Sequence, residues 1–223
     1  MEQHVKILMV DDHPMIIEGY QNTLIATKKE FQQLDIDIAH DCDMANELIK
    51  KAASTKPYDV LFFDISLPAS KDGLITSGED LAKIARVYLP DAKIIILTMF
   101  NESFRILNII KEINPEGLLI KSDLTSSELA EAFQHILNSE TYYSSTVSNF
   151  LNTSITSDIY VDETNRKILH LLSQGIKTRS LKDHIDLSMS AIEKRKKQLK
   201  VLFSIEDSKD ESLLKEARNK GFL

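Results

Sequence analysis

Side chains able to handle a phosphoryl group follow four short apolar runs in the first half of the chain. Asp11 and Asp12 follow the first run, and Asp64, Thr98 and Lys121 each follow a later one. Three carboxylates brought together repel one another unless a cation lies among them, and a hard divalent ion such as Mg²⁺ suits such a cluster. A hydroxyl and an ammonium are the groups needed to hold a phosphoryl oxygen. The pattern indicates phosphoryl transfer onto a carboxylate.

The apolar runs that carry these side chains alternate with segments of helical spacing. We expect strands at Val5–Val10, Ile36–Ala39, Val60–Phe63, Ile94–Leu97 and Gly117–Ile120. Helices are expected over Met15–Leu24, Met44–Ala53, Leu81–Val87, Phe104–Ile113 and Leu129–Leu137. Parallel strands need crossover helices, so this alternation predicts an α/β fold with a doubly wound, five-stranded parallel sheet. Ligands bind such sheets at the carboxyl ends of the strands, where the five side chains would meet.

The rest of the chain is different in composition. Residues 139–157 are rich in Ser, Thr and Asn without sustained periodicity, so we expect a linker. Beyond them, Asp162 and Ser188 are candidate N-caps and Gly175 is a candidate helix stop. The pattern predicts a small all-α domain of four helices. The expected organisation is a sheet domain at residues 1–138, the linker at 139–157 and the helical domain at 158–223.

Composition narrows the class of protein. A single cysteine, Cys42, excludes an internal disulfide framework and fits a reducing compartment. The apolar runs are far shorter than the roughly 18 residues of a membrane span, and no secretory signal is found, so we expect a cytoplasmic protein. The formal net charge is −7, yet residues 158–223 carry 14 basic and 11 acidic side chains. This asymmetry fits a second domain that meets a polyanion, although ordinary solvated surface also explains it.

Four motifs resemble the receiver domain of two-component response regulators. They are Ile7–Pro14, Asp59–Ile65 with Pro68, Ile96–Thr98 and Leu119–Ser122. The run Val-Asp-Asp-His-Pro, followed by Glu18-Gly19, is similar to the NarL/FixJ type, which carries a LuxR-type helix-turn-helix at its C-terminus. The resemblance covers about residues 4–138 and implies a flavodoxin-like receiver.

This resemblance implies a role for each side chain of the cluster. Asp64 would be the phosphoacceptor, Thr98 would bond the phosphoryl group and Lys121 would pair with it. The implied ligands of Mg²⁺ are Asp11, Asp12, Asp64 and the backbone carbonyl of Ser66. The implied partners are a sensor histidine kinase and, on phosphorylation, a second copy of the chain. The chain would be a signalling acceptor rather than an enzyme, with at most slow self-catalysed phosphotransfer and dephosphorylation.

Two features depart from the receiver pattern. Residues 69–77 lengthen the loop after Asp64, which would either cover the acceptor or be a tolerated surface insertion. Leu118 stands where the family usually has an aromatic residue whose rotamer reports phosphorylation. A switch based on ring rotation is therefore not expected.

The third helix of the C-terminal domain is the candidate DNA-binding element. Lysines supply phosphate contacts, and arginine or glutamine can reach base edges. The candidate DNA-binding residues are Ser190, Lys194, Arg195, Lys197 and Gln198. Several motifs, among them Ile168–Gly175 and Leu187-Ser188, resemble the LuxR-type module over about residues 160–223. Duplex DNA is therefore an expected partner.

Departures in this module leave an alternative open. Asn165 stands where the family usually has a glutamate, and Glu193 stands where a lysine usually meets the DNA backbone. Lys194 and Arg195 replace the usual Asn-His pair. A degenerate helical module that binds protein rather than DNA is the alternative interpretation.

A third hypothesis belongs to the enzyme class. Magnesium-dependent phosphatases of the doubly wound type also form an acyl phosphate on an aspartate. Those enzymes need a second acidic residue two positions after the nucleophile, and Ser66 stands at that position after Asp64. The sequence therefore favours a signalling acceptor over a phosphatase.

Overall fold

The computed structural model describes residues 2–99, 103–156, 161–205, 207–220 and 222–223. Contacts between residues divide the chain into two compact units, the first built mainly from residues up to 147 and the second mainly from residues 148–223. Each unit has its own apolar core. No helix in the described part of the chain is both long enough and apolar enough to cross a bilayer.

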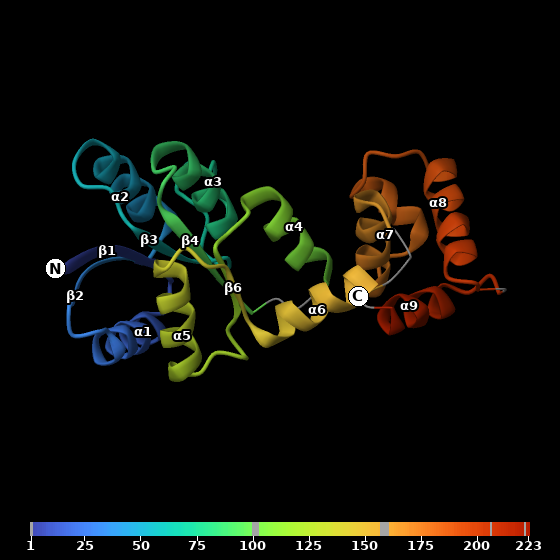
Figure 1. Ribbon diagram of the computed structural model, residues 1–223. Coiled ribbons are helices and arrows are strands. Elements are labelled where there is room, and N and C mark those ends of the chain that lie inside the picture. Colours follow the sequence, from blue (N-terminus) through green and yellow to red (C-terminus); the bar gives the residue numbers. More distant parts are fainter. Residues whose placement is uncertain (1, 100–102, 157–160, 206, 221) are drawn as a thin grey trace. The chain divides into compact units, whose positions relative to one another are not determined.

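The first unit is a parallel sheet with helices on both faces. Its strands are β1 (Gln3–Val10), β2 (Gln32–Ala39), β3 (Val60–Asp64), β4 (Lys93–Thr98), β5 (Gly117–Ile120) and β6 (Tyr142–Tyr143), in the spatial order β2-β1-β3-β4-β5-β6. Its helices are α1 (Pro14–Thr27), α2 (Cys42–Ser54), α3 (Gly78–Tyr88), α4 (Ser103–Ile113) and α5 (Ser126–Leu137). Helices α1 and α5 lie on one face of the sheet, and α2, α3 and α4 lie on the other (Figure 1). The predicted doubly wound parallel sheet is confirmed, with one strand more than the five expected.

Burial explains why the apolar runs became strands. Every residue of β3 and β5 is buried, and so is all of β4 except Lys93. Strands covered on both faces need apolar side chains at consecutive positions, which is the pattern that the sequence has. Helix starts also follow local chemistry, since Pro14 lies in the first turn of α1 and Thr125 Oγ1 accepts a hydrogen bond from Glu128 N at 3.2 Å.

The segment expected to be an irregular linker contains regular structure. Strand β6 pairs in parallel with β5, and Ser145–Thr156 form helix α6. The sequence of α6 is rich in Ser, Thr and Asn, which are poor helix formers in isolation. Val147 is fully buried and Phe150 is nearly so. Packing of these two side chains therefore overrides the weak helix propensity of the segment.

The described residues of the second unit form helices joined by turns, with no strand among them. It comprises α7 (Glu163–Ser173), the 3₁₀ helix η1 (Thr178–Asp183), α8 (Met189–Leu202) and α9 (Asp210–Asn219). The predicted caps are confirmed, because Asp162 accepts a hydrogen bond from Asn165 N at 2.8 Å and Ser188 accepts one from Ala191 N at 3.3 Å. Gly175 has a φ of 81°, which suits a residue that ends a helix. All four predicted helices are present, and the second of them is the 3₁₀ helix η1.

Candidate functional site

Three aspartates meet at the carboxyl end of the sheet. Asp11 and Asp12 follow β1, and Asp64 is the last residue of β3, which lies beside β1 with Val10 opposite Phe63. Asp11 and Asp64 are 1% and 2% exposed, whereas Asp12 is partly exposed. One ligand atom from each aspartate and one from His13 lie within 4.8 Å of one another. The fold thus concentrates negative charge at this edge of the sheet, with Asp11 and Asp64 buried and Asp12 and His13 toward solvent.

Lys121 places one positive charge among these carboxylates. Its Nζ lies 2.6 Å from Asp11 Oδ2 and 3.1 Å from Asp64 Oδ1, and its side chain is only 8% exposed. Backbone geometry fixes this position, since Lys121 N donates a hydrogen bond to Thr98 O at 2.7 Å and so joins the ends of β4 and β5. Residues that are 110 positions apart in the chain become direct neighbours.

The charges of the cluster do not balance. Burial raises the pKa of Asp64, the ammonium of Lys121 opposes that rise, and the carboxylate of Asp11 reinforces it. One ammonium faces three carboxylates, so an additional cation would lower the electrostatic energy of the cluster. The donors are hard carboxylate oxygens, which are the ligands that Mg²⁺ prefers. The residues present therefore fit a magnesium ion.

Two further predicted residues lie beside the cluster. Thr98 is fully buried at the end of β4, the strand next to Asp64 in the sheet. Ser66 is exposed and lies two positions after Asp64, and its backbone N–H hydrogen-bonds to Asp64, which favours the ionised form of that carboxyl group. The part assigned to the Ser66 carbonyl stays a prediction.

His13 contacts the cluster without having been assigned a part from the sequence. Its Nδ1 lies 2.7 Å from Asp12 Oδ1 and 3.2 Å from Asp11 Oδ1, and its backbone N–H donates to Asp11 Oδ1 at 3.0 Å. The imidazole is 63% exposed and so lies on the solvent side of the two aspartates. The His-Pro step after the paired aspartates was the available sequence signal.

Gly78 is a second residue whose importance only the structure shows. A Cβ atom added at this position would lie 1.9 Å from the backbone oxygen of Asp64. The first residue of α3 therefore packs directly on the backbone of Asp64, and any larger residue would displace one of them. The sequence marked Gly78 only as the end of the long loop.

The long loop before α3 is held by its own polar groups. Ser70 Oγ donates to Asp72 Oδ1 at 2.6 Å and accepts from Ile75 N at 3.0 Å, and both Ser70 and Ile75 are buried. Lys71 N donates to Asp43 Oδ2 on α2 at 3.1 Å. Leu74 at the tip is 80% exposed. These contacts run within the loop and to a neighbouring helix, which favours a surface insertion over a cover for the acceptor.

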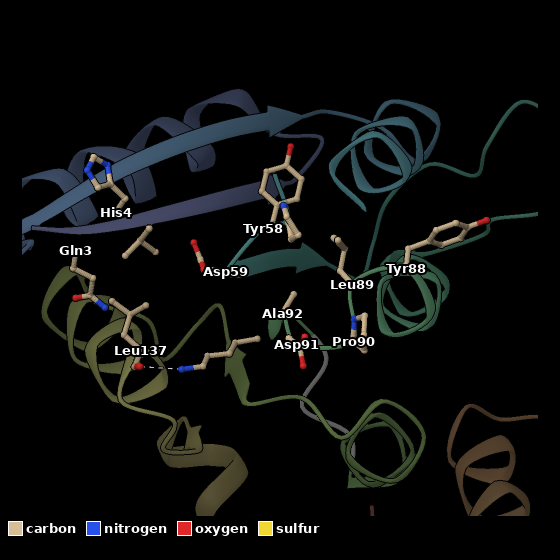
Figure 2. Close-up of a pocket in the computed structure, with 13 residues that line it drawn as sticks. Gln3, His4, Tyr58, Asp59, Tyr88, Leu89, Pro90, Asp91, Ala92 and Leu137 are labelled. Atoms are coloured by element: carbon tan, nitrogen blue, oxygen red, sulfur yellow. Dashed lines mark hydrogen bonds between the residues drawn. The ribbon is translucent and has the colours of Figure 1, made fainter. Parts of the chain in front are cut away.

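A separate pocket of about 280 Å³ lies at the opposite edge of the sheet (Figure 2). It is lined by the first residues of β1 and β4 and by Tyr58, Asp59 and Leu137. Lys93 Nζ donates to Leu137 O there at 2.9 Å. The lining of this pocket has no counterpart of the buried pair Asp11 and Asp64.

Comparison with known proteins identifies the family. Residues 7–143 match the response regulator receiver domain, and these residues make up more than half of the chain. The chain belongs to the response regulator receiver family. The oxygen regulatory protein NreC of Staphylococcus epidermidis is 26% identical to it over 205 residues, which cover 86% of this chain and 88% of NreC. The predicted resemblance to two-component response regulators is confirmed.

Solved structures agree on the fold. RcsB from Salmonella enterica serovar Typhimurium, bound to a promoter in the presence of the phosphomimetic BeF3−, is 22% identical, with a TM-score of 0.61 over 95% of this chain and 97% of that one. A LuxR-family response regulator from Aurantimonas sp. is 26% identical, with a TM-score of 0.53 over 66% of this chain and 94% of that one. The fold of nearly the whole chain, receiver and helical domain together, is therefore shared with RcsB, whereas the Aurantimonas match covers about two thirds of the chain.

In this response regulator, helix α8 presents a polar face to solvent. Ile192, Lys196 and Leu199 are buried on its inner side. Four predicted DNA-binding residues are exposed, namely Ser190, Lys194, Lys197 and Gln198. Within the described part of the chain, neither Lys194 nor Lys197 makes an ion pair. Both ammonium groups are therefore available to a polyanion.

The fifth predicted DNA-binding residue has another partner. Arg195 Nη1 lies 2.8 Å from Asp162 Oδ2 and 3.2 Å from Asn165 Oδ1, both at the start of α7. Arg195 and Asn165 are two of the departures from the LuxR pattern, and the structure brings them into direct contact. We therefore interpret them as a matched pair that holds α8 against α7, and Arg195 is left out of the DNA surface proposed below.

Proposed function

We propose that Asp64 accepts a phosphoryl group from a sensor histidine kinase, and that this modification controls the output of the helical unit. The observation that carries the proposal is the contact of one buried ammonium, Lys121, with two buried carboxylates, Asp11 and Asp64, at the carboxyl edge of a receiver sheet. The carboxylates there carry more negative charge than Lys121 neutralises, and the carboxylate oxygen of Asp64 would be the nucleophile.

The proposed reaction is an in-line transfer. A carboxylate oxygen of Asp64 attacks the phosphorus of a phosphohistidine, the P–N bond breaks as the O–P bond forms, and the imidazole leaves and takes up a proton. Thr98 and Lys121 each offer a donor to the phosphoryl oxygens, which lowers the energy of the charge that gathers on them. Water can later attack the same acyl phosphate, which accounts for slow self-catalysed loss of the group.

Asp11, Asp12 and Asp64 would hold a magnesium ion, with the backbone carbonyl of Ser66 as the further proposed ligand. Bound Mg²⁺ would neutralise carboxylate charge and offset the negative charge of the incoming phosphoryl group. The side chains supply the rest, since Asp11 also orients Lys121 through its 2.6 Å contact. We propose that this phosphotransfer takes place in the cytoplasm, a reducing compartment that the free Cys42 fits.

A small phosphodonor tests the acceptor directly. The full chain is incubated with phosphoramidate and Mg²⁺, and intact mass is measured before and after treatment with base. We expect one base-labile phosphoryl group on the wild type and on Asp91→Asn, an exposed aspartate at the far edge of the sheet. Asp64→Asn should carry none. Undiminished labelling of Asp64→Asn would exclude Asp64 as the acceptor.

For the output, we propose that the exposed face of α8 binds duplex DNA and that phosphorylation pairs two copies of the chain. Lys194 and Lys197 would contact phosphates, and Ser190 and Gln198 would face the groove. A solved structure has RcsB bound to a promoter in the presence of the phosphomimetic BeF3−, which supports the proposal by analogy of fold. Two-fold pairing is the commonest assembly and would present two copies of α8 to DNA.

A second candidate output is supported by apolar exposure at the end of the same helix. Val201 and Leu202 are 72% and 38% exposed, and together with Lys194, Lys197 and Gln198 they line a shallow pocket. Exposed aliphatic groups of this kind suit a protein partner better than a phosphate backbone. Fluorescence anisotropy on duplex DNA at two salt concentrations, with and without BeF3−, separates the candidates. Binding that weakens with salt supports DNA, and a flat response supports protein.

A further inference from the structure

Polar contacts join the turn after β5 to the start of α6. Lys121 opens this turn, in which Asp123 N donates to Ile120 O at 2.9 Å. The carboxylate of Asp123 accepts hydrogen bonds from Thr146 N at 3.1 Å, from Thr146 Oγ1 at 3.0 Å and from Ser144 Oγ at 2.9 Å. A carboxylate two residues after Lys121 thus binds the first turn of α6.

Ser144 adds a second connection between the same two elements. Its side chain is completely buried, and its Oγ accepts a hydrogen bond from Ile120 N at 3.2 Å while donating to Asp123. Its backbone N–H donates to Leu118 O at 3.1 Å. The residue before α6 is therefore bonded to β5 and to Asp123 at once, and the β5 turn and the helix start form one hydrogen-bonded group.

Charge strengthens this arrangement. The N-terminus of a helix attracts negative charge, yet the first turn of α6 has no acidic residue of its own. Asp123 provides that charge from another element. Burial acts against its ionisation, but the hydrogen bonds from Thr146 and Ser144 outweigh this and hold the pKa of Asp123 below its ordinary value. The contacts are therefore charge-assisted, which makes them stronger than neutral hydrogen bonds.

We propose that Asp123 is a positioning residue that couples Lys121 to helix α6, so that phosphorylation of Asp64 and the state of the first turn of α6 influence each other. This inference rests on the proposed function, because it takes Asp64 as the acceptor. Lys121 now bonds to Asp11 and Asp64, and a phosphoryl group on Asp64 competes for the same ammonium. When Lys121 turns to that group, the turn that carries Asp123 moves with it.

Rotation of an aromatic side chain on β5 cannot report phosphorylation in this chain. Leu118 occupies the corresponding position of β5, is fully buried and has no ring to rotate. Its backbone oxygen instead holds Ser144. The Asp123 contacts thus provide a connection from the phosphoryl site to an element that continues out of the receiver sheet.

Coupling between two sites is reciprocal, so substitutions at Asp123 and Thr146 should alter the stability of a phosphoryl group on Asp64. The full chain is labelled with phosphoramidate, and the rate of dephosphorylation is measured for Asp123→Asn, Thr146→Val, the double variant and the control Asp91→Ala. We expect each single variant to change the dephosphorylation rate about fivefold, and the double variant to change it no more than one of them. Asp91→Ala should match the wild type.

Hydrogen exchange of the first turn of α6 supplies the second measurement. In the wild type, BeF3− with Mg²⁺ should change the exchange of the Thr146 and Val147 amides, and in Asp123→Asn this change should be lost. A purely local cap would make these amides exchange faster in Thr146→Val and leave dephosphorylation unaltered, and that result would overturn the coupling. Failure of the wild type to become labelled would instead overturn the proposed function and this inference together.

Discussion

Each unit of the protein encloses one lysine almost completely, and the two surroundings differ in charge. Lys121 in the receiver and Lys196 in the helical unit both have side chains only 8% exposed. Lys121 faces Asp11 and Asp64, which are themselves buried, with Asp12 beside them. Lys196 lies 2.9 Å from Asp210 Oδ2 and donates to Thr178 Oγ1 at 2.6 Å, and the side chain of Asp210 is 37% exposed.

We interpret this difference as the one between the proposed phosphoryl site and a structural ion pair. Around Lys196 the ammonium bonds to Asp210 and Thr178 and has Glu193 Oε2 at 4.0 Å. Lys200 Nζ lies 3.5 Å from the same Asp210, so two ammonium groups face two carboxylates and the charges balance while α8 is joined to η1 and α9. Around Lys121 one ammonium has more carboxylates than it can neutralise, and the cluster is stable only because the surrounding fold enforces it. An excess of buried charge of one sign is thus the better sign of function.

Removal of the receiver lysine should have the largest effect. In Lys121→Met, we expect the rate of Asp64 labelling at saturating Mg²⁺ to fall about 100-fold, because a donor to the transferring phosphoryl group is lost. The matched control is Lys71→Met, at an exposed position of the long loop. Labelling rates from intact mass give the result, and equal rates in Lys121→Met and wild type would contradict the part assigned to Lys121.

Removal of Asp210, the ion-pair partner of Lys196, should lower the stability of the helical unit. Asp210→Asn removes the carboxylate nearest to the buried ammonium of Lys196 and leaves only Glu193, 4.0 Å away, and we expect a loss of about 2 kcal/mol in the stability of the helical unit. Lys196→Met should cost less, because an apolar chain tolerates the enclosed position. Hydrogen exchange of α8 and α9 measures both, with the exposed Asp186→Asn as control. A larger loss in Lys196→Met than in Asp210→Asn would reverse the comparison.

Acid should weaken the helical unit. Burial acts against ionisation of Asp162 and Asp210, but their hydrogen bonds and ion pairs prevail and hold the pKa of each below its ordinary value near 3.9. Their contribution to stability is complete above that value and is lost as the pH falls through the lower pKa of the folded state. Melting of the helical unit followed from pH 6 to pH 2.5 should show this loss, and it should be smaller in a variant with asparagine at both positions.

Surface charge on α8 should have the smallest effect. Glu193→Lys should tighten non-specific binding to duplex DNA a few-fold and make its salt dependence steeper by roughly one counterion, since a carboxylate facing phosphates is replaced by an ammonium. Lys197→Ala should act in the opposite direction, and Lys215→Ala on α9 should have no effect. Anisotropy at two salt concentrations measures all three. An unchanged salt slope in both α8 variants would remove this face from the DNA surface.

The sequence predicted best those features that depend on neighbouring residues or on a general rule of the fold. Buried strands need consecutive apolar residues, and parallel strands end together, so the meeting of Asp11, Asp64 and Lys121 followed from where three apolar runs stop. The caps at Asp162 and Ser188 are local patterns of the same kind.

Features formed by distant polar pairs were not predictable. Strand β6 has two residues, too few for any periodicity, and α6 depends on a carboxylate more than twenty positions earlier in the chain. Arg195 and Asn165 were each noted as departures, but nothing in their local sequence indicates that they touch. Their contact arises from helix packing, which sets the distance between residues that are 30 positions apart.

Strand β6 also decides where the receiver can be cut from the rest of the protein. Tyr142 N donates to Glu116 O and Ser144 N to Leu118 O, so these bonds cover the outer side of β5. A fragment ending at residue 138 would leave β5, a buried apolar strand, as an open sheet edge. Open edges of this kind recruit strands from other molecules, and such a fragment would aggregate. An excised receiver should therefore extend at least through β6 and Ser144 to remain monodisperse.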